Sequence, residues 1–245
     1  MISIKGKWAL VTGASRGIGA LAAIELAKNG CNLVLHSRKV EHAEKVLAQA
    51  KALGVDAYAI AADLEDDNDV RRMLADIDSK GTDISIVLNN AGIQVTYRPF
   101  PEYYKTPTEE FVKSLKVNTV APMIICYHYL PKMIEKGFGR IVNTTSGIDK
   151  EPEQPAYSAS KAALDKVTKD LATKVNGTDV MLNLLDPGWC RTDLGGPNAP
   201  NAPESAIPGA VLGVFADDKV SGRIFSAQDY AGMSLADAVA KVEGK

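Results

Sequence analysis

A tyrosine and a lysine stand four residues apart in the second half of the chain. On a helix, Tyr157 and Lys161 would project from one face, one turn apart. A phenol ordinarily titrates near pH ~10, too high for easy proton exchange at neutral pH. A nearby ammonium favours the phenolate, so this pair is suited to exchanging a proton with a carbonyl or carbinol oxygen. Such pairs also occur on ordinary helix surfaces, so other motifs must support this interpretation.

A glycine-rich turn near the N-terminus is suited to binding a phosphate. The segment TGASRGIG, residues 12–19, follows an apolar run and precedes a helical pattern. Glycine permits a tight turn and lets the backbone approach a pyrophosphate, whose charge the helix N-terminus favours. The glycine spacing differs from the common G-x-G-x-x-G pattern. Taken alone, the turn is also compatible with a plain strand–helix connection.

Strand and helix patterns alternate along the chain and must position these residues. Apolar runs bounded by turn residues predict strands, and helical patterns between them stop at Gly30, Gly54 and Gly137. A repeat of about 30 residues predicts an α/β fold, a single Rossmann-type doubly wound parallel sheet of about seven strands with helices on both faces. We expect one domain over residues 1–245. The predicted strands are 9–11, 33–35, 57–61, 84–88, 141–142, 180–185 and 223–226, and the main predicted helices are 18–29, 40–53, 67–77, 108–136 and 156–175.

Three segments depart from this pattern. Residues 93–108 are rich in proline and aromatic residues, and residues 187–210 in proline and glycine. Both follow strands at their carboxyl ends, where open α/β sheets bind ligands, so we expect both to shape a substrate pocket. Tyr103 and Tyr104 would favour an apolar or ring-bearing substrate; alternatively these rings pack on the chain's own helices. Pro122 predicts a break in the helix 108–136, and the tail 228–245 could cap the pocket or block a subunit contact.

Composition excludes several classes of protein. The 28 basic and 30 acidic side chains give a net charge of −2, so we expect no nucleic acid or membrane as partner. No apolar run approaches the roughly 18 residues of a membrane span, and the N-terminus lacks a secretory pattern. Three scattered cysteines and three histidines argue against disulfides and a metal site. These features favour a cytoplasmic protein without a metal.

Five separated motifs together resemble the short-chain dehydrogenase/reductase family. They occur in the family's order, and the resemblance covers residues 5 to about 227. It implies an oxidoreductase that transfers hydride between a nicotinamide cofactor and a small carbonyl or alcohol substrate, with a tyrosine as general acid and base. Residues 187–196 are similar to the carbonyl-reductase-like branch. The motifs are TGASRGIG (12–19), Asn89-Asn90-Ala91-Gly92, Asn118, Tyr157-Ser158-Ala159-Ser160-Lys161 and Pro187-Gly188.

The resemblance implies four catalytic residues: Ser146, Tyr157, Lys161 and Asn118. In the family, the lysine also holds the nicotinamide ribose, the serine polarises the substrate oxygen, and the asparagine kinks its helix and carries a water that contacts the lysine. Ser146 lies 11 residues before Tyr157, about two fewer than the family usually leaves. Thr145 or Thr144 therefore stays open as an alternative source of the hydroxyl.

The resemblance also implies a cofactor site. Asp63 would accept from the adenine amino group, although it could instead cap the next helix, and Thr192 would bind the nicotinamide carboxamide. The implied cofactor-binding residues are Gly13, Ser15, Arg16, Gly17, Ile18, Gly19, Ser37, Arg38, Asp63, Leu64, Asn90, Ala91, Gly92, Tyr157, Lys161, Pro187, Gly188 and Thr192.

The end of the second strand favours NADP(H) over NAD(H). NAD-specific sites carry an acidic residue there, which repels a 2′-phosphate. Here Ser37 stands at about that place, and Arg38 follows it. A guanidinium can bind a phosphate through two hydrogen bonds, and Arg16 brings a second cation. The alternative is that both arginines are solvated surface charges.

Two other functions stay open. One is a regulatory protein that binds the cofactor without turnover, although such a protein has no need of the complete Ser, Tyr, Lys and Asn set. The other is a reductase of C=N or C=C bonds, because the fold does not settle the reaction. The family further implies a homotetramer or homodimer that pairs the helices 108–136 and 156–175.

Overall fold

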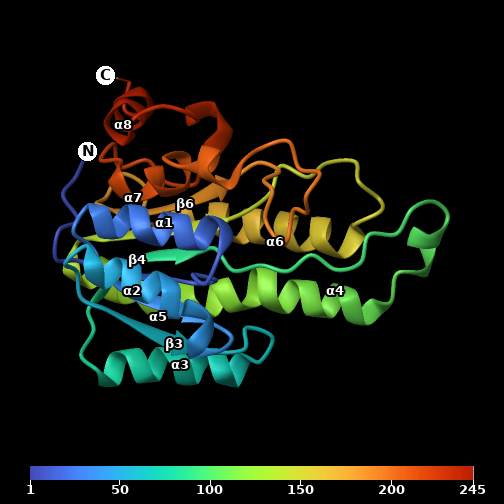
Figure 1. The fold of residues 1–245 in the computed structure, drawn as a ribbon, viewed down its shortest axis with the longest axis horizontal. Helices are drawn as coiled ribbons and strands as arrows, with labels where there is room; N and C mark the ends of the chain where they lie inside the picture. Colours follow the sequence, from blue (N-terminus) through green and yellow to red (C-terminus); the bar gives the residue numbers. More distant parts are fainter. Residues whose placement is uncertain (245) are drawn as a thin grey trace.

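The computed structural model describes residues 1–244. At its centre seven parallel strands form one sheet, as the sequence predicts, and the structure gives their order as β3-β2-β1-β4-β5-β6-β7 (Figure 1). The strands are β1 (Trp8–Val11), β2 (Asn32–Ser37), β3 (Ala57–Ala61), β4 (Ile84–Asn89), β5 (Gly139–Thr144), β6 (Val180–Asp186) and β7 (Ile224–Ser226). The helices are α1 (Gly17–Lys28), α2 (Glu44–Ala52), α3 (Asp67–Ser79), α4 (Thr108–Leu115), α5 (Ala121–Lys136), α6 (Pro155–Ala172), α7 (Leu212–Phe215) and α8 (Leu235–Val242).

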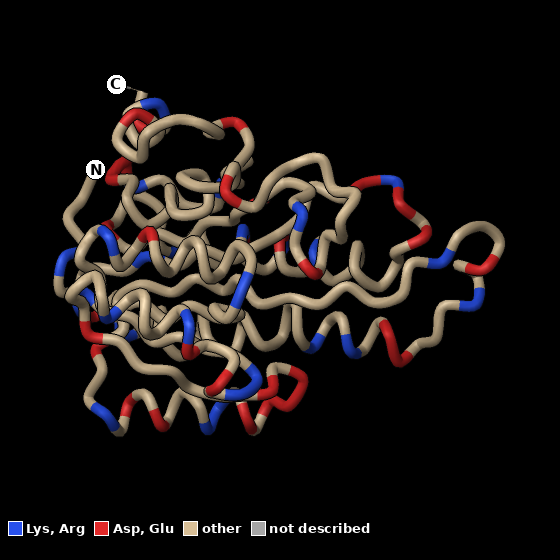
Figure 2. The backbone as a smooth tube through the Cα atoms, viewed as in Figure 1, with Lys and Arg blue, Asp and Glu red and all other residues tan. Residues whose placement is uncertain are grey.

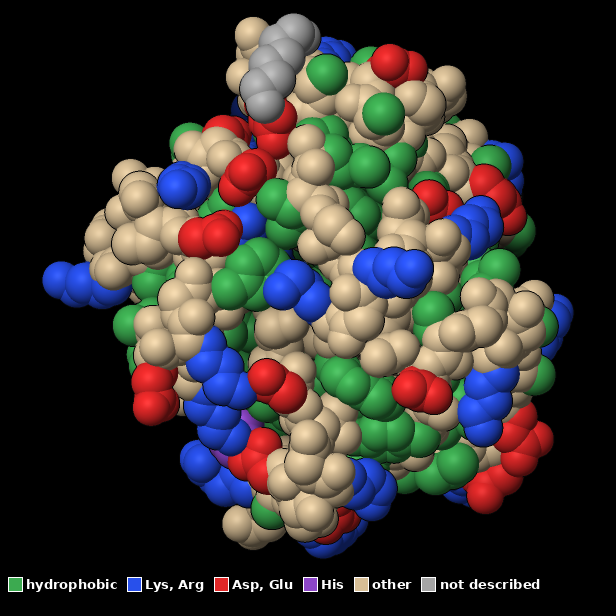
Figure 3. All heavy atoms as spheres, turned by 90° about the vertical axis from the view of Figure 1, so that its left-hand side faces the viewer, with side chains coloured by type: hydrophobic (Ala, Val, Ile, Leu, Met, Phe, Trp, Pro, Cys, Tyr) green, Lys and Arg blue, Asp and Glu red, His purple; other side chains and the backbone are tan. Residues whose placement is uncertain are grey.

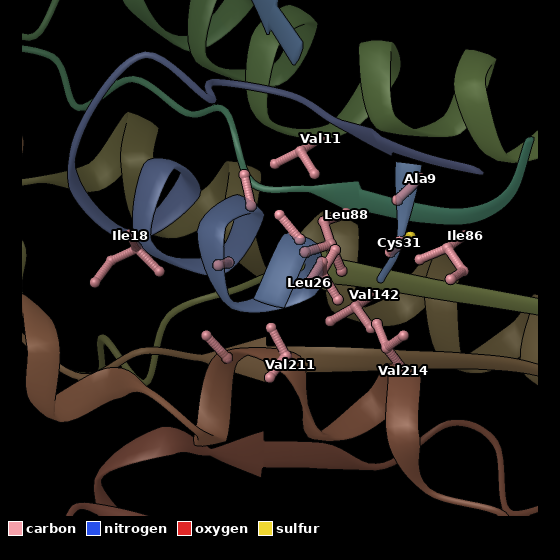
Figure 4. Packing of buried hydrophobic residues seen from close by; sticks show 14 of the residues in the cluster. Ala9, Val11, Ile18, Leu26, Cys31, Ile86, Leu88, Val142, Val211 and Val214 are labelled. Atoms are coloured by element: carbon pink, nitrogen blue, oxygen red, sulfur yellow. The ribbon is translucent and has the colours of Figure 1, made fainter. Parts of the chain in front are cut away.

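Helices cover both faces of the sheet because successive strand residues point to opposite sides. Ala9 and Val11 of β1 belong to a cluster with residues of α1, α2, α7 and α8. Leu10, between them, belongs to a second cluster with residues of α3, α5 and α6. Figure 4 shows the first cluster, in which Leu26 of α1 and Val214 of α7 lie near strand residues. Strands buried on both faces account for the continuous apolar runs in the sequence.

The helical region 108–136 is broken at a different place from the one that Pro122 predicts. A π turn, Lys116–Val120, separates α4 from α5, and Pro122 lies in the first turn of α5, where its missing N–H costs little. The helix then ends at Gly137, as predicted, with φ +70°. The segment predicted as helix from residue 40 instead starts with a 3-10 turn, Val40–Ala43.

The long connections gather at the carboxyl end of the strands, at the right of Figure 1. They comprise residues 12–16, 90–107, 145–154 and 187–208. The C-terminal tail starts beside these connections at Gln228 but then leaves them: Ala238 and Val239 of α8 pack into the first core cluster, beside α7 and the N-terminus (Figure 1). The helix α8 therefore extends the core and does not cap the carboxyl end of the sheet.

Charged side chains of both signs are dispersed along the chain (Figure 2). Figure 3 views the end opposite the long connections, where basic and acidic side chains lie among hydrophobic ones. No helix within residues 1–244 is long and apolar enough to cross a membrane.

Candidate active site

Three of the predicted catalytic side chains meet where β5 ends and α6 begins. Tyr157, in the first turn of α6, is 8% exposed, and its hydroxyl lies near Ser146, just beyond β5. Lys161 follows one turn later, and its Nζ donates to the Thr144 carbonyl at 2.7 Å. This Nζ lies 5.7 Å from the centre of the Tyr157 ring. The spacing of tyrosine and lysine in the sequence thus places both beside the same strand end.

The geometry favours Ser146 over the two threonines as the third hydroxyl. Ser146 Oγ accepts a hydrogen bond from the Ile148 N–H at 3.2 Å, which orients it within the short loop before α6. Thr145 is buried, and its hydroxyl lies near Asp165 of α6. Thr144 contributes its carbonyl to Lys161. The loop is short, yet the Ser146–Tyr157 contact is made.

Burial and nearby charges set the protonation of this group. Burial raises the pKa of Tyr157 above its usual value, the bond with Ser146 opposes this, and the Asp186 carboxylate raises it further. Burial lowers the pKa of Lys161 to about 8, although Asp165 acts against this decrease. The tyrosine is therefore a protonated phenol at neutral pH, ready to donate.

Asn118 ties the helical region 108–136 to the strand ends. It lies in the π turn between α4 and α5 and is fully buried. Its Oδ1 accepts from the Ile93 N–H, and its Nδ2 donates to the Ile93 carbonyl, both at 2.8 Å. Nδ2 also donates to Ser160 Oγ at 3.0 Å, and Ser160 directly precedes Lys161 in sequence. The side chain therefore has a positioning role, and it fixes the local helix irregularity that the family resemblance implies.

The glycine-rich turn packs too tightly for larger residues. A Cβ on Gly13 would lie 2.9 Å from Ala91 Cα, and one on Gly19 would lie 2.4 Å from Asn90 Nδ2. Asn90 Nδ2 donates to the Thr12 carbonyl at 3.1 Å, so the turn after β1 and the segment after β4 form one unit. A Cβ on Gly17 would meet Thr192 at 3.3 Å. The turn can therefore pack this closely against the segment after β4 only because Gly13 and Gly19 carry no side chain.

These residues fit a nicotinamide dinucleotide. Lys161 spends one of its three N–H donors on Thr144 and retains two toward Gly92, whose would-be Cβ lies 3.5 Å from Nζ. Ser15 and Pro187 are half-buried along the same edge, and Gly188 adopts φ +73° at the start of the loop after β6. Ile18 and Leu64 are buried, and they support this edge through packing.

The two predicted phosphate-binding arginines differ in their surroundings. Arg38, just after β2, is exposed and has no charged partner within residues 1–244. Arg16 is paired with Asp193 of the loop after β6, with 2.8 Å between Nε and Oδ2. Ser37 is buried, and its hydroxyl donates to the Lys39 carbonyl at 2.6 Å. The Ser37 hydroxyl was expected to donate to a phosphate, but in this structure it donates to the Lys39 carbonyl instead.

Asp63 does not cap the next helix. The N-cap of α3 is Asp66, whose side chain accepts from the Asn68 N–H. Asp63 is exposed after β3, and its Oδ1 accepts from the Glu65 N–H at 2.9 Å. The alternative considered for Asp63 is thus wrong, and its second carboxylate oxygen stays available to a ligand.

A shallow cleft of about 350 Å³ opens between the glycine-rich turn and the loop after β6, lined by Arg16, Gly92, Ile93, Gln94, Val95, Asp193 and Leu194. Only the first residues of the segment 93–108 reach it. Phe100, Tyr103 and Tyr104 instead contact one another at the tip of that segment, which projects from the molecule (Figure 1). Phe100 is 70% and Tyr104 76% exposed. The expectation that these rings line the pocket is wrong for this structure.

Sequence reasoning missed four residues that support the site. Thr12 Oγ1 accepts from the N–H groups of Asn90 and Ala91, each at 3.0 Å. His36 is buried beneath the glycine-rich turn, and this burial lowers the pKa of its imidazole. Gln228 Nε2 donates to the Pro187 carbonyl at 2.8 Å. Asp186 lies beside Ser146 and Gly147. Two of the four have a sequence signal: Thr12 begins the motif TGASRGIG, and Asp186 directly precedes the Pro-Gly motif.

Comparisons with known proteins agree with this geometry. The family model described as short chain dehydrogenase matches residues 7–202. Versicolorin reductase 1 of Aspergillus parasiticus is 36% identical over 197 residues, covering 78% of this chain and 72% of the relative. A 3-oxoacyl-acyl-carrier-protein reductase of Aquifex aeolicus is 32% identical over 196 residues, covering 79% and 77%. A solved metagenomic short-chain oxidoreductase in complex with NADP is 28% identical, with a TM-score of 0.78 over 92% of this chain and 98% of that one.

Proposed function

The chain belongs to the short-chain dehydrogenase family of oxidoreductases, and we propose that it interconverts a carbonyl and an alcohol with NADP(H). The observation that carries the proposal is the group formed by Ser146, Tyr157 and Lys161 at the end of β5, next to a turn that fits a dinucleotide. A pure binding protein needs the turn but not this group.

The side chains divide the work of carbonyl reduction. A bound nicotinamide supplies hydride to the carbonyl carbon. The Tyr157 hydroxyl donates its proton to the carbonyl oxygen, and Ser146 donates a second hydrogen bond that orients this oxygen. The Lys161 ammonium stabilises the phenolate that forms and holds ribose hydroxyls with its remaining donors. In alcohol oxidation, the same groups act in reverse.

Three observations support NADP(H) as the cofactor. The chain has no acidic residue at the end of β2, Arg38 is exposed there, and a related structure holds NADP. The 2′-phosphate would also attract Arg16, which must then exchange its partner Asp193 for the phosphate.

The direct test follows NADPH absorbance with a panel of ketones and aldehydes. We expect steady oxidation of NADPH with at least some carbonyl compounds. Binding of NADPH without turnover on any of them would favour a regulatory protein. Turnover confined to imines or activated alkenes would favour a C=N or C=C reductase, because the same fold can support several reduction reactions.

Replacing Ser146 by alanine should lower kcat by roughly 10²- to 10³-fold, because one of two donors to the substrate oxygen is lost. The matched control is Thr145→Ala, which removes a buried hydroxyl from the adjacent residue that faces Asp165. We expect the control to keep kcat within about threefold. Steady-state kinetics with a saturating ketone decides, and the opposite ranking of the two variants would assign the hydroxyl to Thr145.

Carbonyl reduction should weaken at alkaline pH because of Lys161. Its pKa is lowered to about 8, whereas that of Tyr157 is raised by burial. As the pH rises past about 8, the lysine loses its charge first, and the phenolate loses its stabilising partner. We expect kcat/KM for a ketone to be flat near neutral pH and to fall above about pH 8. A profile that stays flat through pH 9.5 would contradict this role of the lysine.

We also propose that the protein self-associates through α4 and α5. Exposed apolar side chains follow these helices, including Val112, Tyr127 and Ile134. Within residues 1–244, nothing covers them. Sedimentation at micromolar concentration should give a mass above that of one 26.1 kDa chain, and a monomer would refute the proposal.

A further inference from the structure

A carboxylate with no role in the proposed mechanism lies beside the catalytic group. Asp186 is the last residue of β6, next to β5, and directly precedes Pro187. Leu184 points to the cluster on the α6 side of the sheet, so Asp186, two residues later, points to that side as well. That side of the sheet also carries Tyr157.

The position of the carboxylate is fixed from two directions. Asp186 Oδ1 accepts a hydrogen bond from the Gly188 N–H at 2.9 Å, which locks the side chain over the turn that begins the substrate loop. Asp186 Oδ2 lies 2.7 Å from the place where a Cβ on Gly147 would be, so it contacts the backbone directly after Ser146. A larger residue at position 147 would displace this carboxylate oxygen.

The second oxygen of this carboxylate is not used within the protein. Asp186 Oδ2 has no hydrogen-bond or ion-pair partner among residues 1–244. Asp186 is only half-buried and stands at the carboxyl end of β6. Besides burial, the Asp186 charge raises the pKa of Tyr157 and the pKa of Cys190. The carboxylate therefore lies near both the tyrosine and the loop that follows β6. A partly desolvated carboxylate oxygen without a donor is a strong acceptor for one.

We propose that Asp186 Oδ2 accepts a hydrogen bond from a hydroxyl or ammonium group that the substrate carries next to its reacting carbonyl. Ser146 and Tyr157 hold the carbonyl oxygen, and Asp186, beside Gly147, is placed to meet the adjoining substituent. The favoured class is therefore α-hydroxy or α-amino ketones, or the matching diols and amino alcohols. The Asp186 carboxylate repels ketones that carry a carboxylate at that position. Plain alkyl ketones have no group that can donate a hydrogen bond to Asp186 Oδ2.

The inference rests on the proposed function, and a matched series of ketones tests both. All four compounds carry a phenyl ketone and differ at the carbon next to the carbonyl. They are α-hydroxyacetophenone, α-aminoacetophenone, the isosteric propiophenone, and phenylglyoxylate. We expect wild-type kcat/KM for the hydroxy and amino ketones to exceed that for propiophenone by about tenfold or more, because hydrogen bonds to charged groups are the strong ones. Phenylglyoxylate should be the poorest substrate.

Two variants assign this preference to Asp186. Asp186→Ala should bring the ratio of kcat/KM for the hydroxy ketone to kcat/KM for propiophenone close to one. Asp186→Asn keeps an acceptor oxygen for the Gly188 N–H, so this variant should retain the local fold even if Asp186→Ala does not. It should retain part of the preference for the hydroxy ketone and lose that for the amino ketone. Asp149→Asn, which removes an exposed carboxylate from the loop before α6, is the control and should leave all ratios unchanged.

Each failure has its own signature. If the wild type reduces propiophenone but the ratios are the same in both Asp186 variants, the inference is wrong and the proposed function stands. If Asp186→Asn changes the dissociation constant of NADPH more than tenfold without altering the ratios, the carboxylate belongs to the cofactor site and the inference is again wrong. If the wild type oxidises NADPH with no carbonyl compound, the proposed function fails and the inference falls with it.

Discussion

Tyr157→Phe should abolish carbonyl reduction while leaving NADPH binding nearly intact. The substitution deletes the hydroxyl that lies near Ser146 and keeps the ring, which is 8% exposed and packs at the start of α6. Loss of a general acid typically lowers the rate about 10²- to 10⁴-fold. Lys161 keeps its bond to the Thr144 carbonyl and its remaining donors, so the nicotinamide ribose should still be held.

Tyr129→Phe is the matched control for this experiment. Tyr129 of α5 is also a buried tyrosine, and its hydroxyl has no hydrogen-bond partner among residues 1–244. The control should keep wild-type kcat. Pre-steady-state kinetics and fluorescence titration with NADPH measure the two effects separately. A Tyr157→Phe enzyme with near wild-type kcat would show that another group supplies the proton.

Replacing Ser37 by Asp and Arg38 by Leu should lower kcat/KM for NADPH by at least about 100-fold and narrow or invert the preference over NADH. The new carboxylate at the end of β2 would accept from ribose hydroxyls and repel a 2′-phosphate. The second change removes an exposed guanidinium without a charged partner in residues 1–244, which is free to form two bonds with that phosphate.

Single variants divide this effect between the two residues. Because the Ser37 hydroxyl already donates to the Lys39 carbonyl, Arg38→Leu alone should account for most of the loss with NADPH and leave kcat/KM for NADH unchanged. Lys174→Leu, which removes an exposed cation after α6, is the control. A wild-type enzyme that favours NADH over NADPH would overturn the cofactor assignment.

Much of the fold follows from local patterns. A parallel sheet of about seven strands with helices on both faces could be predicted because apolar strands alternate with helices that end at Gly30, Gly54 and Gly137, and because parallel crossovers have one hand. The break before α5 could not be placed from Pro122, since it depends on the bonds of Asn118 to Ile93 and Ser160, which are distant in sequence.

The site divides in the same way. Tyr157 and Lys161 could be placed together because helical spacing brings the pair onto one face, whereas Ser146 was implied by the family resemblance, with Thr145 and Thr144 as alternatives. The pairing of Arg16 with Asp193 could not be predicted, because it joins two loops whose paths depend on tertiary packing. For the same reason, the aromatic residues of 93–108 looked like a pocket wall but form an exposed cluster.

The central claim is that this chain moves hydride between a nicotinamide and a carbonyl carbon. The most direct measurement uses NADPH deuterated at both C4 positions, a ketone from the panel that the enzyme reduces, and mass spectrometry of the product. We predict an alcohol with a single deuterium on the carbinol carbon and one NADPH oxidised per alcohol formed. Oxidation of NADPH without deuterium at that carbon would contradict the account.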